Sequence, residues 1–519
     1  MKIKYLLLLL CFMGSFMGFA QGDNSEIHKV PARKEIRHRL APQQQEAMYG
    51  QPASTRATGD YLMQEFPTQG EVRGVVLLVA FEDVPFSMSD DSIRTILQNR
   101  YDGDYYTEYL EYHGYSSIDN DSMHLRVEIP GSARDYFRMQ SMGQFTPRFD
   151  VIGPVTLGNP RKHYGANTAS GSDKNARAMV IEACRKAHEQ ELVDYSQYDA
   201  NGDGAVDFVY VVYAGSDEAQ TAIEECIWAH SSSVSLTLGG MKIGRYACSG
   251  ELFVDLPGLT AGIGTFVHEF SHILGLPDFY NTTDDRNTKL SMDVWSVMDY
   301  GMYNRGGFVP CAYTAFERYS LGWLPMTTLD TPATMSLGTT DEEGTGYRIF
   351  VTDDNTIADT ASFYLVETIR KEGWNSYAYA EGLLISQVTY KASAWRNNTV
   401  NTGHAYRHYV VPASNCWSIV GDYNPKKHLY GVENHEFTLC SVPASITQTG
   451  YAMDKPLTDI NYDAKTGRTT FYFRGGAGMG DSVIHDPSEY GIKYDLQGRP
   501  INQSFKGVYI QDKRKYIQF

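Results

Sequence analysis

Residues 268–278 read HEFSHILGLPD, and the organisation of the whole chain follows from this stretch. His268 and His272 are four residues apart, so on an α-helix they lie on one face and can hold a metal ion together. Glu269 lies about a third of a turn away, where its carboxylate can reach a water at the metal but is poorly placed as a ligand. This arrangement is typical of zinc hydrolases, in which zinc activates water and the glutamate transfers protons.

The residues after the second histidine predict the end of the helix and a third ligand. Gly275 lets the chain leave the helix because glycine accepts the left-handed conformation there, and Pro277 prevents the helix from continuing. Asp278 can then turn back as an oxygen ligand. One alternative is a glutamate from a later helix, with Glu317 as the candidate. Another is a buried helix whose histidines only form hydrogen bonds in the core, which the spaced third ligand argues against.

Length and composition indicate a large protein with an ordinary hydrophobic content. A chain of 519 residues is too long for one compact core, so two or three domains are expected. Hydrophobic residues make up 42% and charged residues 21%, as in soluble globular proteins, and the 37 tyrosines fit a β-rich secreted architecture. The net charge of −17 argues against nucleic acid or an anionic membrane surface as a partner, because both favour a basic face.

The start of the chain predicts export. Residues 1–20 have the form of a signal peptide, with Lys2 and Lys4 ahead of an apolar stretch and a small-x-small cleavage site at residues 18–20. The alternative, a transmembrane anchor, is less favoured because the apolar run is short and broken by glycines. No later segment reaches the roughly 20 apolar residues of a membrane span. A secreted protein, extracellular or on the cell surface, is therefore expected.

Six cysteines follow this leader, and an oxidising compartment allows them to form disulfides. They are Cys184, Cys226, Cys248, Cys311, Cys416 and Cys440. The local candidates for pairing are Cys226 with Cys248 and Cys416 with Cys440.

Residues 21–70 are polar and irregular, which is typical of a removable pro-region before a secreted hydrolase; a disordered spacer is the alternative. This segment contains no cysteine, so a latency mechanism would need a carboxylate such as Asp60 or Glu65. The next stretch, residues 74–81, reads GVVLLVAF and predicts a strand buried on both faces. Further predictions are helices over residues 87–99 and 175–191 and strands over residues 124–129, 208–213, 225–230 and 244–251.

A second candidate metal site lies at residues 199–207, which read DANGDGAVD. Oxygen-bearing side chains occupy the first, third, fifth and ninth positions, Asp199, Asn201, Asp203 and Asp207, and Gly204 permits the sharp turn. This pattern predicts a calcium loop. It differs from an EF-hand because position twelve is Tyr210 and a strand follows. An Asx-rich turn without metal is the alternative.

Residues 293–301 read DVWSVMDYG, and their methionine, Met298, lies twenty residues after Asp278. Met298 in a tight turn can form a hydrophobic floor beneath the ligands, although an ordinary core position would also explain it. The phenol of Tyr300 could reach the metal site and donate to an oxyanion.

The spaced motif HExxHxxGxxD, with a turn methionine and a tyrosine two residues later, resembles the metzincin clan of metallopeptidases. Within this clan the sequence resembles the M6 family of immune inhibitor A-like secreted proteases over about residues 70–420. The resemblance is carried by GVVLLVAFED, DANGDGAVD, ECIWAH, TFVHEFSHILGLPDFY, WSVMDYG and residues 310–324 ending in LGWL. Ser271 departs from the family, which usually has glycine there.

The resemblance implies zinc endopeptidase activity, bound calcium and a secreted precursor that is activated by proteolysis. Carried over residue by residue, it implies zinc ligands at His268, His272 and Asp278, a general base at Glu269, a turn methionine at Met298 and its tyrosine at Tyr300. The spacing of the residues indicates the first four roles independently, whereas those of Met298 and Tyr300 depend mainly on the resemblance.

The expected architecture is an α/β metzincin-like catalytic domain over residues 71–330, with a twisted mixed sheet and the active-site helix. An all-β, sandwich-like domain over residues 331–475 should follow, because short alternating strands are separated there by Gly, Asn and Asp. Examples are residues 363–368, 382–390, 406–411 and 469–473. Residues 476–519 form a linker and a tail that resembles the C-terminal tails of secreted or surface proteins of Bacteroidetes, which makes it a candidate sorting signal or a final hairpin.

The leading functional prediction is a secreted zinc endopeptidase that acts on protein or peptide substrates. A calcium-stabilised surface binding or adhesion protein with an inactive core is a different class, and the intact His268, Glu269, His272 and Asp278 argue against it. The ligands alone do not distinguish a peptidase from a zinc hydrolase with another substrate.

Overall fold

The computed structural model of the chain describes residues 66–98, 129–169, 171–252, 261–283, 288–351, 360–403 and 405–475, and strands between residues 493 and 518. The predicted signal peptide, nearly all of the predicted pro-region with Asp60 and Glu65, and most of the strand predicted over residues 124–129 lie outside these ranges.

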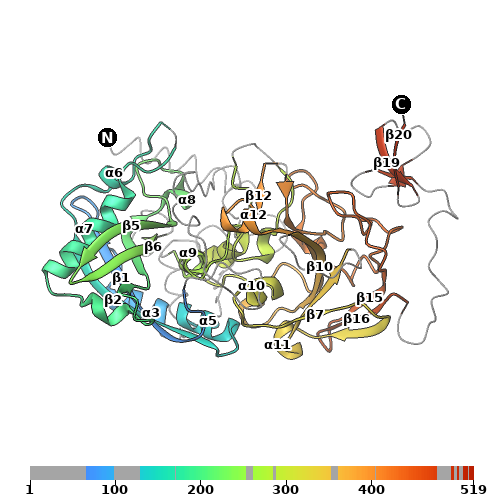
Figure 1. The fold of residues 1–519 in the computed structure, drawn as a ribbon, viewed down its shortest axis with the longest axis horizontal. Helices are drawn as coiled ribbons and strands as arrows, with labels where there is room; N and C mark the ends of the chain where they lie inside the picture. The colour runs from blue at the N-terminus through green and yellow to red at the C-terminus, as the bar shows by residue number, and fades with distance from the viewer. Residues whose placement is uncertain are drawn as a thin grey trace, which may run out of the picture.

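A six-stranded mixed sheet forms the first half of the molecule (Figure 1). Its order is β2-β1-β4-β6-β3, all parallel, and β5 pairs antiparallel with β6. The strands are β1 (Gly70–Ala80), β2 (Phe145–Thr156), β3 (Ala205–Val206), β4 (Val209–Ser216), β5 (His230–Leu238) and β6 (Met241–Leu252). The prediction of a strand at residues 74–81 is confirmed by β1, which lies between β2 and β4 and is covered on both faces, as is typical of parallel strands.

The two faces of β1 contribute side chains to two different hydrophobic clusters, because successive side chains of a strand point to opposite sides. Val75, Leu77 and Val79 pack with α7 (Ala176–Glu189). The alternate residues on the other face pack with α3 (Asp90–Gln98), α5 (Ala133–Gln140) and α9 (Gly264–Ile273). Figure 1 shows the sheet between α7 and α9. The sheet therefore supports α9, which carries both histidines of the sequence motif.

One predicted strand is wrong in its first part. Residues 225–229 form no strand, and β5 begins only at His230. The backbone of this segment bonds instead to the start of a short helix and to a loop. Ile227 O accepts from Glu218 N at 2.9 Å, and Trp228 N donates to Asp173 Oδ2 at 3.1 Å. These tertiary partners replace a strand ladder.

The predicted disulfides are also wrong. All six cysteines lie within the described residues, and the structure joins no two of them in a disulfide. The Cys226 sulfur lies 3.9 Å from Ser216 Oγ, whereas the Cys248 sulfur lies 3.5 Å from His230 Nδ1. The thiols of this candidate pair thus point to different partners.

A five-stranded sheet dominates the second half, in the order β14-β11-β10-β9-β7. Its strands are β7 (Met326–Thr328), β9 (Gly346–Phe350), β10 (Thr360–Ile369), β11 (Gly382–Lys391) and β14 (His408–Val410). A three-stranded sheet of β8 (Ala333–Leu337), β15 (Leu457–Asp463) and β16 (Arg468–Phe473) lies beside it. Short helices are present as well, including α11 (Thr340–Glu343) and α12 (Ala392–Arg396).

One hydrophobic cluster crosses the domain boundary that the sequence predicts at residue 330. Phe270 of α9 belongs to the same cluster as Phe316 of α10 (Ala315–Ser320) and Phe363 of β10. The ring of Phe316 lies 6.0 Å from that of Phe363 and 6.1 Å from that of Trp395 in α12. The helix with the two histidines is therefore buried together with the second sheet.

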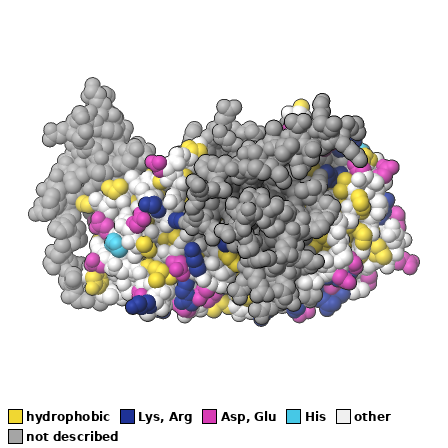
Figure 2. Space-filling view, turned by 180° about the vertical axis from the view of Figure 1, so that it is seen from behind, with side chains coloured by type: hydrophobic (Ala, Val, Ile, Leu, Met, Phe, Trp, Pro, Cys, Tyr) yellow, Lys and Arg dark blue, Asp and Glu magenta, His cyan; other side chains and the backbone are white. Residues whose placement is uncertain are grey.

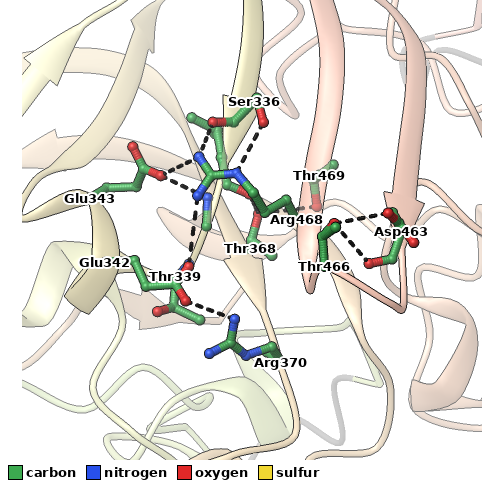
Figure 3. Close-up of polar contacts among 12 residues, drawn as sticks. Ser336, Thr339, Glu342, Glu343, Thr368, Arg370, Asp463, Thr466, Arg468 and Thr469 are labelled. Carbon is green, nitrogen blue, oxygen red and sulfur yellow. Dashed lines mark hydrogen bonds and ion pairs between the residues drawn. The ribbon is translucent and has the colours of Figure 1, made fainter.

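Polar contacts fasten the three-stranded sheet to α11 (Figure 3). Arg468 on β16 donates from Nη2 to Glu343 at 2.8 Å and from Nε to Ser336 Oγ at 3.0 Å. Arg370 donates to Glu342 at 2.8 Å. These pairs are partly open to water, which screens them, so each contributes little to stability.

The surface of the described part carries both signs of charge, and Figure 2 shows Lys and Arg side chains interspersed with Asp and Glu. No helix of the described residues is long and apolar enough to cross a membrane. The last described strands are β17 (Lys493–Asp495), β18 (Pro500–Ile501), β19 (Gly507–Gln511) and β20 (Arg514–Gln518), which form a small sheet of their own.

Candidate metal centre

The helix α9 is buried along its whole length and ends at Ile273, two residues before the predicted glycine. Gly275 has φ 104°, and its N–H donates to His272 O at 3.0 Å. The N–H of Leu276 donates to Ser271 O at 3.0 Å. These two bonds form a Schellman cap, which only a left-handed residue completes readily. The cap reverses the chain and returns it towards the histidines.

The reversed chain brings Asp278 against both histidines. Its Oδ1 lies 3.3 Å from His268 Nε2 and 3.2 Å from His272 Nε2, and all three side chains are buried. Among the described residues, this is the one set of three or more His, Cys, Asp or Glu side chains with ligand atoms within 4.8 Å of one another. The structure thus brings together the three residues that the sequence predicts as zinc ligands.

The hydrogen bonds of the two imidazoles determine which nitrogen of each ring faces Asp278. His268 Nδ1 lies 2.8 Å from Val297 O, and His272 Nδ1 lies 2.7 Å from Leu276 O. A carbonyl oxygen only accepts, so each Nδ1 carries a proton, and the neutral form of each ring presents a lone pair at Nε2. Two nitrogen lone pairs and a carboxylate oxygen then converge on one buried point, which suits a cation.

The charges of the cluster lead to the same conclusion. Burial opposes ionisation of both partners, yet Asp278 raises the pKa of His272, and the two histidines hold the pKa of Asp278 well below its ordinary value. The carboxylate therefore requires a positive charge beside it, which either a proton or a metal ion can provide. The donor set, two imidazoles and one carboxylate, fits zinc.

A turn after the motif orients one histidine and the ligand loop. The turn carbonyl of Val297 accepts from His268, and the carbonyl of Met298 accepts from Phe279 N at 2.8 Å. Ser296 Oγ accepts from Met298 N at 3.0 Å and donates to Glu317 Oε1 at 2.6 Å. The turn therefore connects the helix α9 to the residue after Asp278.

Glu317 lies outside the ligand cluster, so the alternative third ligand is wrong for this structure. Its carboxylate caps α10, accepting from Thr314 N at 2.6 Å and Thr314 Oγ1 at 2.7 Å, and it holds Ser296. Burial raises the pKa of Glu317 to about 7. This residue supports the turn and the helix start, which is a structural task.

Asn398 holds the third candidate ligand from the second half of the chain. Its Nδ2 donates to Asp278 Oδ2 at 2.6 Å, and its Oδ1 accepts from Asp278 N at 2.6 Å. Asn398 is fully buried, and its φ of 52° is left-handed. Because Oδ2 is occupied in this way, Oδ1 of the same carboxylate is turned to the two histidines.

A family model described as the catalytic domain of immune inhibitor A peptidase M6 matches residues 65–324. The chain belongs to this family. The pre-pro-metalloprotease PrtV of Vibrio cholerae serotype O1 is 27% identical over 278 residues, which are 48% of this chain and 29% of PrtV. Immune inhibitor A of Bacillus thuringiensis subsp. alesti is 26% identical over 290 residues, 49% of this chain and 41% of that protein. The chain thus aligns with less than half the length of these relatives.

In this M6 chain, the glutamate next to the first ligand of the cluster, Glu269, is buried, with only 1% of its surface exposed. Burial raises the pKa of Glu269 to about 8; His272 lowers it, and Asp278 and Asp217 raise it further. A carboxyl group with such a pKa takes up a proton near neutral pH.

Two tyrosines that the sequence did not single out lie near the same charges. Burial raises the pKa of Tyr280, and a hydrogen bond and repulsion from Asp278 add to this. The ring of Tyr280 stacks 6.3 Å from that of His268. Burial raises the pKa of Tyr303, and repulsion from nearby carboxylates, Glu269 and Asp278 among them, adds to this. Its ring lies 6.4 Å from that of Tyr300. Tyr300, half-buried, therefore stands in a group of phenols.

The departure from the family at Ser271 is accommodated within α9. Its side chain is buried, donates to Val267 O at 2.6 Å and forms a short hydrogen bond with the Tyr313 hydroxyl. The Ser271 hydroxyl therefore has its hydrogen-bond partners in Val267 and Tyr313 and does not contact the ligand cluster.

The predicted calcium loop follows the short 3-10 helix η3 (Tyr195–Tyr198), and its carboxylates accept hydrogen bonds from the loop backbone. Asp199 accepts from Asp203 N at 3.0 Å and Gly204 N at 2.9 Å, and Asp207 accepts from Ala200 N at 2.9 Å. Burial raises the pKa of Asp207, and Asp199 and Asp203 raise it further. The oxygens thus crowd around the turn, but they do not form a cluster as close as that of His268.

Asn398, Tyr280 and Tyr303 are residues near the cluster that sequence reasoning missed. Tyr280 offers a weak signal, because it follows Asp278 by two residues. Asn398 offers none, since it lies 120 residues after Asp278 and outside the matched family region.

Proposed function

We propose that this chain is a zinc-dependent endopeptidase. The observation that carries the proposal is the buried convergence of His268 Nε2, His272 Nε2 and Asp278 Oδ1, with both Nδ1 atoms directed to backbone carbonyls. Membership of the M6 peptidase family supports peptide bonds as the substrate class. Zinc held by these atoms would supply Lewis acidity and lower the pKa of a water next to it.

Glu269 is the proposed general base and acid. Its carboxylate takes a proton from the attacking water, and the carboxyl group then gives that proton to the leaving amine. Burial raises the pKa of Glu269 to about 8, which makes its carboxylate a strong enough base to accept a proton from water. A cation held beside it would favour the ionised form that acts as the base. A phenol of the neighbouring group, Tyr300 on the family resemblance, would donate to the oxyanion.

The test is Glu269→Gln, which keeps the shape of the side chain and removes its basicity. We expect zinc content to stay at one per molecule and casein cleavage to fall by about 10²–10⁴-fold. The matched control is Glu225→Gln, an exposed glutamate, which should cleave normally. Undiminished cleavage by Glu269→Gln would refute the role. A protein with an inactive core, or a zinc hydrolase with another substrate, would show no chelator-sensitive cleavage even in the wild type.

Export and activation are part of the same proposal. Residues 1–20 would be removed as a signal peptide and residues 21–70 as a pro-region before the first strand of the sheet. Sequencing of the N-terminus of the protein recovered from culture medium tests both. A start near residue 21 after export and near residue 70 after activation is expected.

The loop at residues 199–207 is proposed to bind calcium through Asp199, Asn201, Asp203 and Asp207. The support is the crowding of their oxygens around one turn and the raised pKa of Asp207. Calcium should raise the unfolding temperature of the wild type. Asp203→Asn should reduce that rise, and an undiminished rise would argue for a turn without metal.

A further inference from the structure

A second set of buried oxygens lies outside both sites already described. It is formed by the loop with Asn167 and Asp173 and by α8 (Glu218–Thr221). Asn167 and Asp173 face each other across an isolated antiparallel bridge. Asn167 Nδ2 donates to Glu218 Oε1 at 2.6 Å, and Trp228 N donates to Asp173 Oδ2 at 3.1 Å. One oxygen of each carboxylate is therefore satisfied and its orientation is set.

The other oxygen of each side chain has no such partner. Asn167 Oδ1, Asp173 Oδ1 and Glu218 Oε2 are buried atoms without a hydrogen-bond partner among the described residues. Glu218 as a whole is only 6% exposed, and its carboxylate is directed towards Asn167 by the bond between them. All three atoms are acceptors, so none of them can donate to another while the carboxylates are ionised.

No ion pair among the described residues balances the charge of this set. Within the described ranges, neither Asp173 nor Glu218 forms an ion pair with a Lys or Arg side chain. Burial raises the pKa of Asp173 to about 8, and repulsion from Glu218 adds to it. Burial raises the pKa of Glu218 to about 7, and Glu224 adds to that. Two carboxylates held at such a place require a positive charge or protons.

We propose that Asn167, Asp173 and Glu218 hold a hard divalent cation, with calcium as the matching ion. The donor atoms are two carboxylate oxygens and one amide oxygen, without nitrogen or sulfur, which excludes a zinc-type donor set. Water and backbone carbonyls complete the coordination shell of calcium readily, because its geometry is flexible. This site is independent of the proposed peptidase activity and of the loop at residues 199–207.

Such a cation would stabilise the N-terminal end of α9. The helix α8 is capped by Asp217, whose Oδ1 accepts from Gln220 N at 2.8 Å. Gln220 Nε2 donates to Thr265 Oγ1 at 3.0 Å, in the first turn of α9. A cation bound by Glu218 therefore joins the loop of Asp173 to a helix that contacts the histidine-bearing helix. Its loss should loosen this side of the molecule first.

The experiment counts calcium ions by equilibrium dialysis of the full chain with zinc present. The loop of residues 199–207 is disabled by Asp199→Asn with Asp203→Asn, so that only the proposed site is counted. We expect one calcium per molecule in this background. Asp173→Asn or Glu218→Gln should each abolish it, because both keep the side-chain shape but remove a charge. Glu225→Gln, a neighbouring exposed position, is the control and should retain it.

Thermal unfolding separates a cation from protons. If the site holds calcium, calcium raises the unfolding temperature of the loop-disabled chain, and this rise is lost in Asp173→Asn and in Glu218→Gln. If the carboxylates hold protons instead, the same variants are stabilised equally with and without calcium, which would overturn the proposal. Unchanged calcium binding in both folded variants, or no calcium in the loop-disabled chain, would overturn it as well.

Discussion

Removal of the Asn398 side chain should weaken zinc binding without touching any ligand. Asn398 makes two hydrogen bonds of 2.6 Å to Asp278, one to the carboxylate and one from the backbone N–H. Its φ of 52° is a conformation that glycine adopts without strain. Asn398→Gly therefore removes the amide group while the backbone keeps its course.

The size of the effect follows from these bonds. A hydrogen bond to a charged group is worth about 1.5–3 kcal/mol, and about 1.4 kcal/mol corresponds to a tenfold change in affinity. Loss of the Nδ2 bond to Asp278 Oδ2 lets the carboxylate rotate away from the histidines. We expect the zinc dissociation constant to rise by about 10–100-fold, the range found when a group that supports a metal ligand is removed.

The assay is competition for zinc between the protein and a chromophoric chelator, so activity is not needed as a readout. Asn434→Ala is the matched control, because Asn434 also holds two carbonyl oxygens, at 3.0 Å and 2.9 Å, in the same half of the chain. It should leave zinc affinity unchanged. Equal zinc affinity of Asn398→Gly and wild type, with both folded, would refute the reasoning that Asn398 positions Asp278.

Three further outcomes are expected. Glu317→Ala should keep one zinc per molecule but lower the free energy of unfolding by about 1–3 kcal/mol, because it leaves buried donors without an acceptor. Asp278→Ala should lose zinc. Loss of zinc from both variants in metal analysis would show that Glu317 is a ligand. Burial raises the pKa of Glu367 to about 7, so the folded state keeps its proton longer than the unfolded state and its stabilising contribution disappears as pH rises from about 4.5 through about 7. Glu367→Gln should therefore gain stability over wild type as pH rises from about 4.5 to about 7 in urea unfolding, and the difference should then level off. A difference that does not change with pH would contradict this. Thiol titration of the folded protein should reach only Cys416 and Cys440, with the other four reacting after denaturation, and fewer than six reactive thiols in the denatured mature chain would show a disulfide.

Local patterns predicted the centre of the fold well. The run at residues 74–81 became a central strand because its side chains are apolar on both faces, and the helix of His268 ended where Gly275 allowed it. The first part of the strand predicted at residues 225–230 is wrong because Trp228 N donates to Asp173, a tertiary partner that no local pattern contains. The predicted disulfides failed for a related reason: spacing along the chain does not state which way a thiol points.

The sequence by itself determined the donor set. The helical repeat places His268 and His272 on one face, and a glycine turn returns Asp278 to them, so chemistry within eleven neighbouring residues was sufficient. Only the tertiary structure decided how that set is held. Asn398 approaches Asp278 across 120 residues, and a shared hydrophobic cluster packs the second sheet against the histidine-bearing helix. Hydrogen bonds and hydrophobic burial act between surfaces that folding brings together, so their partners are not written in the spacing of any one segment.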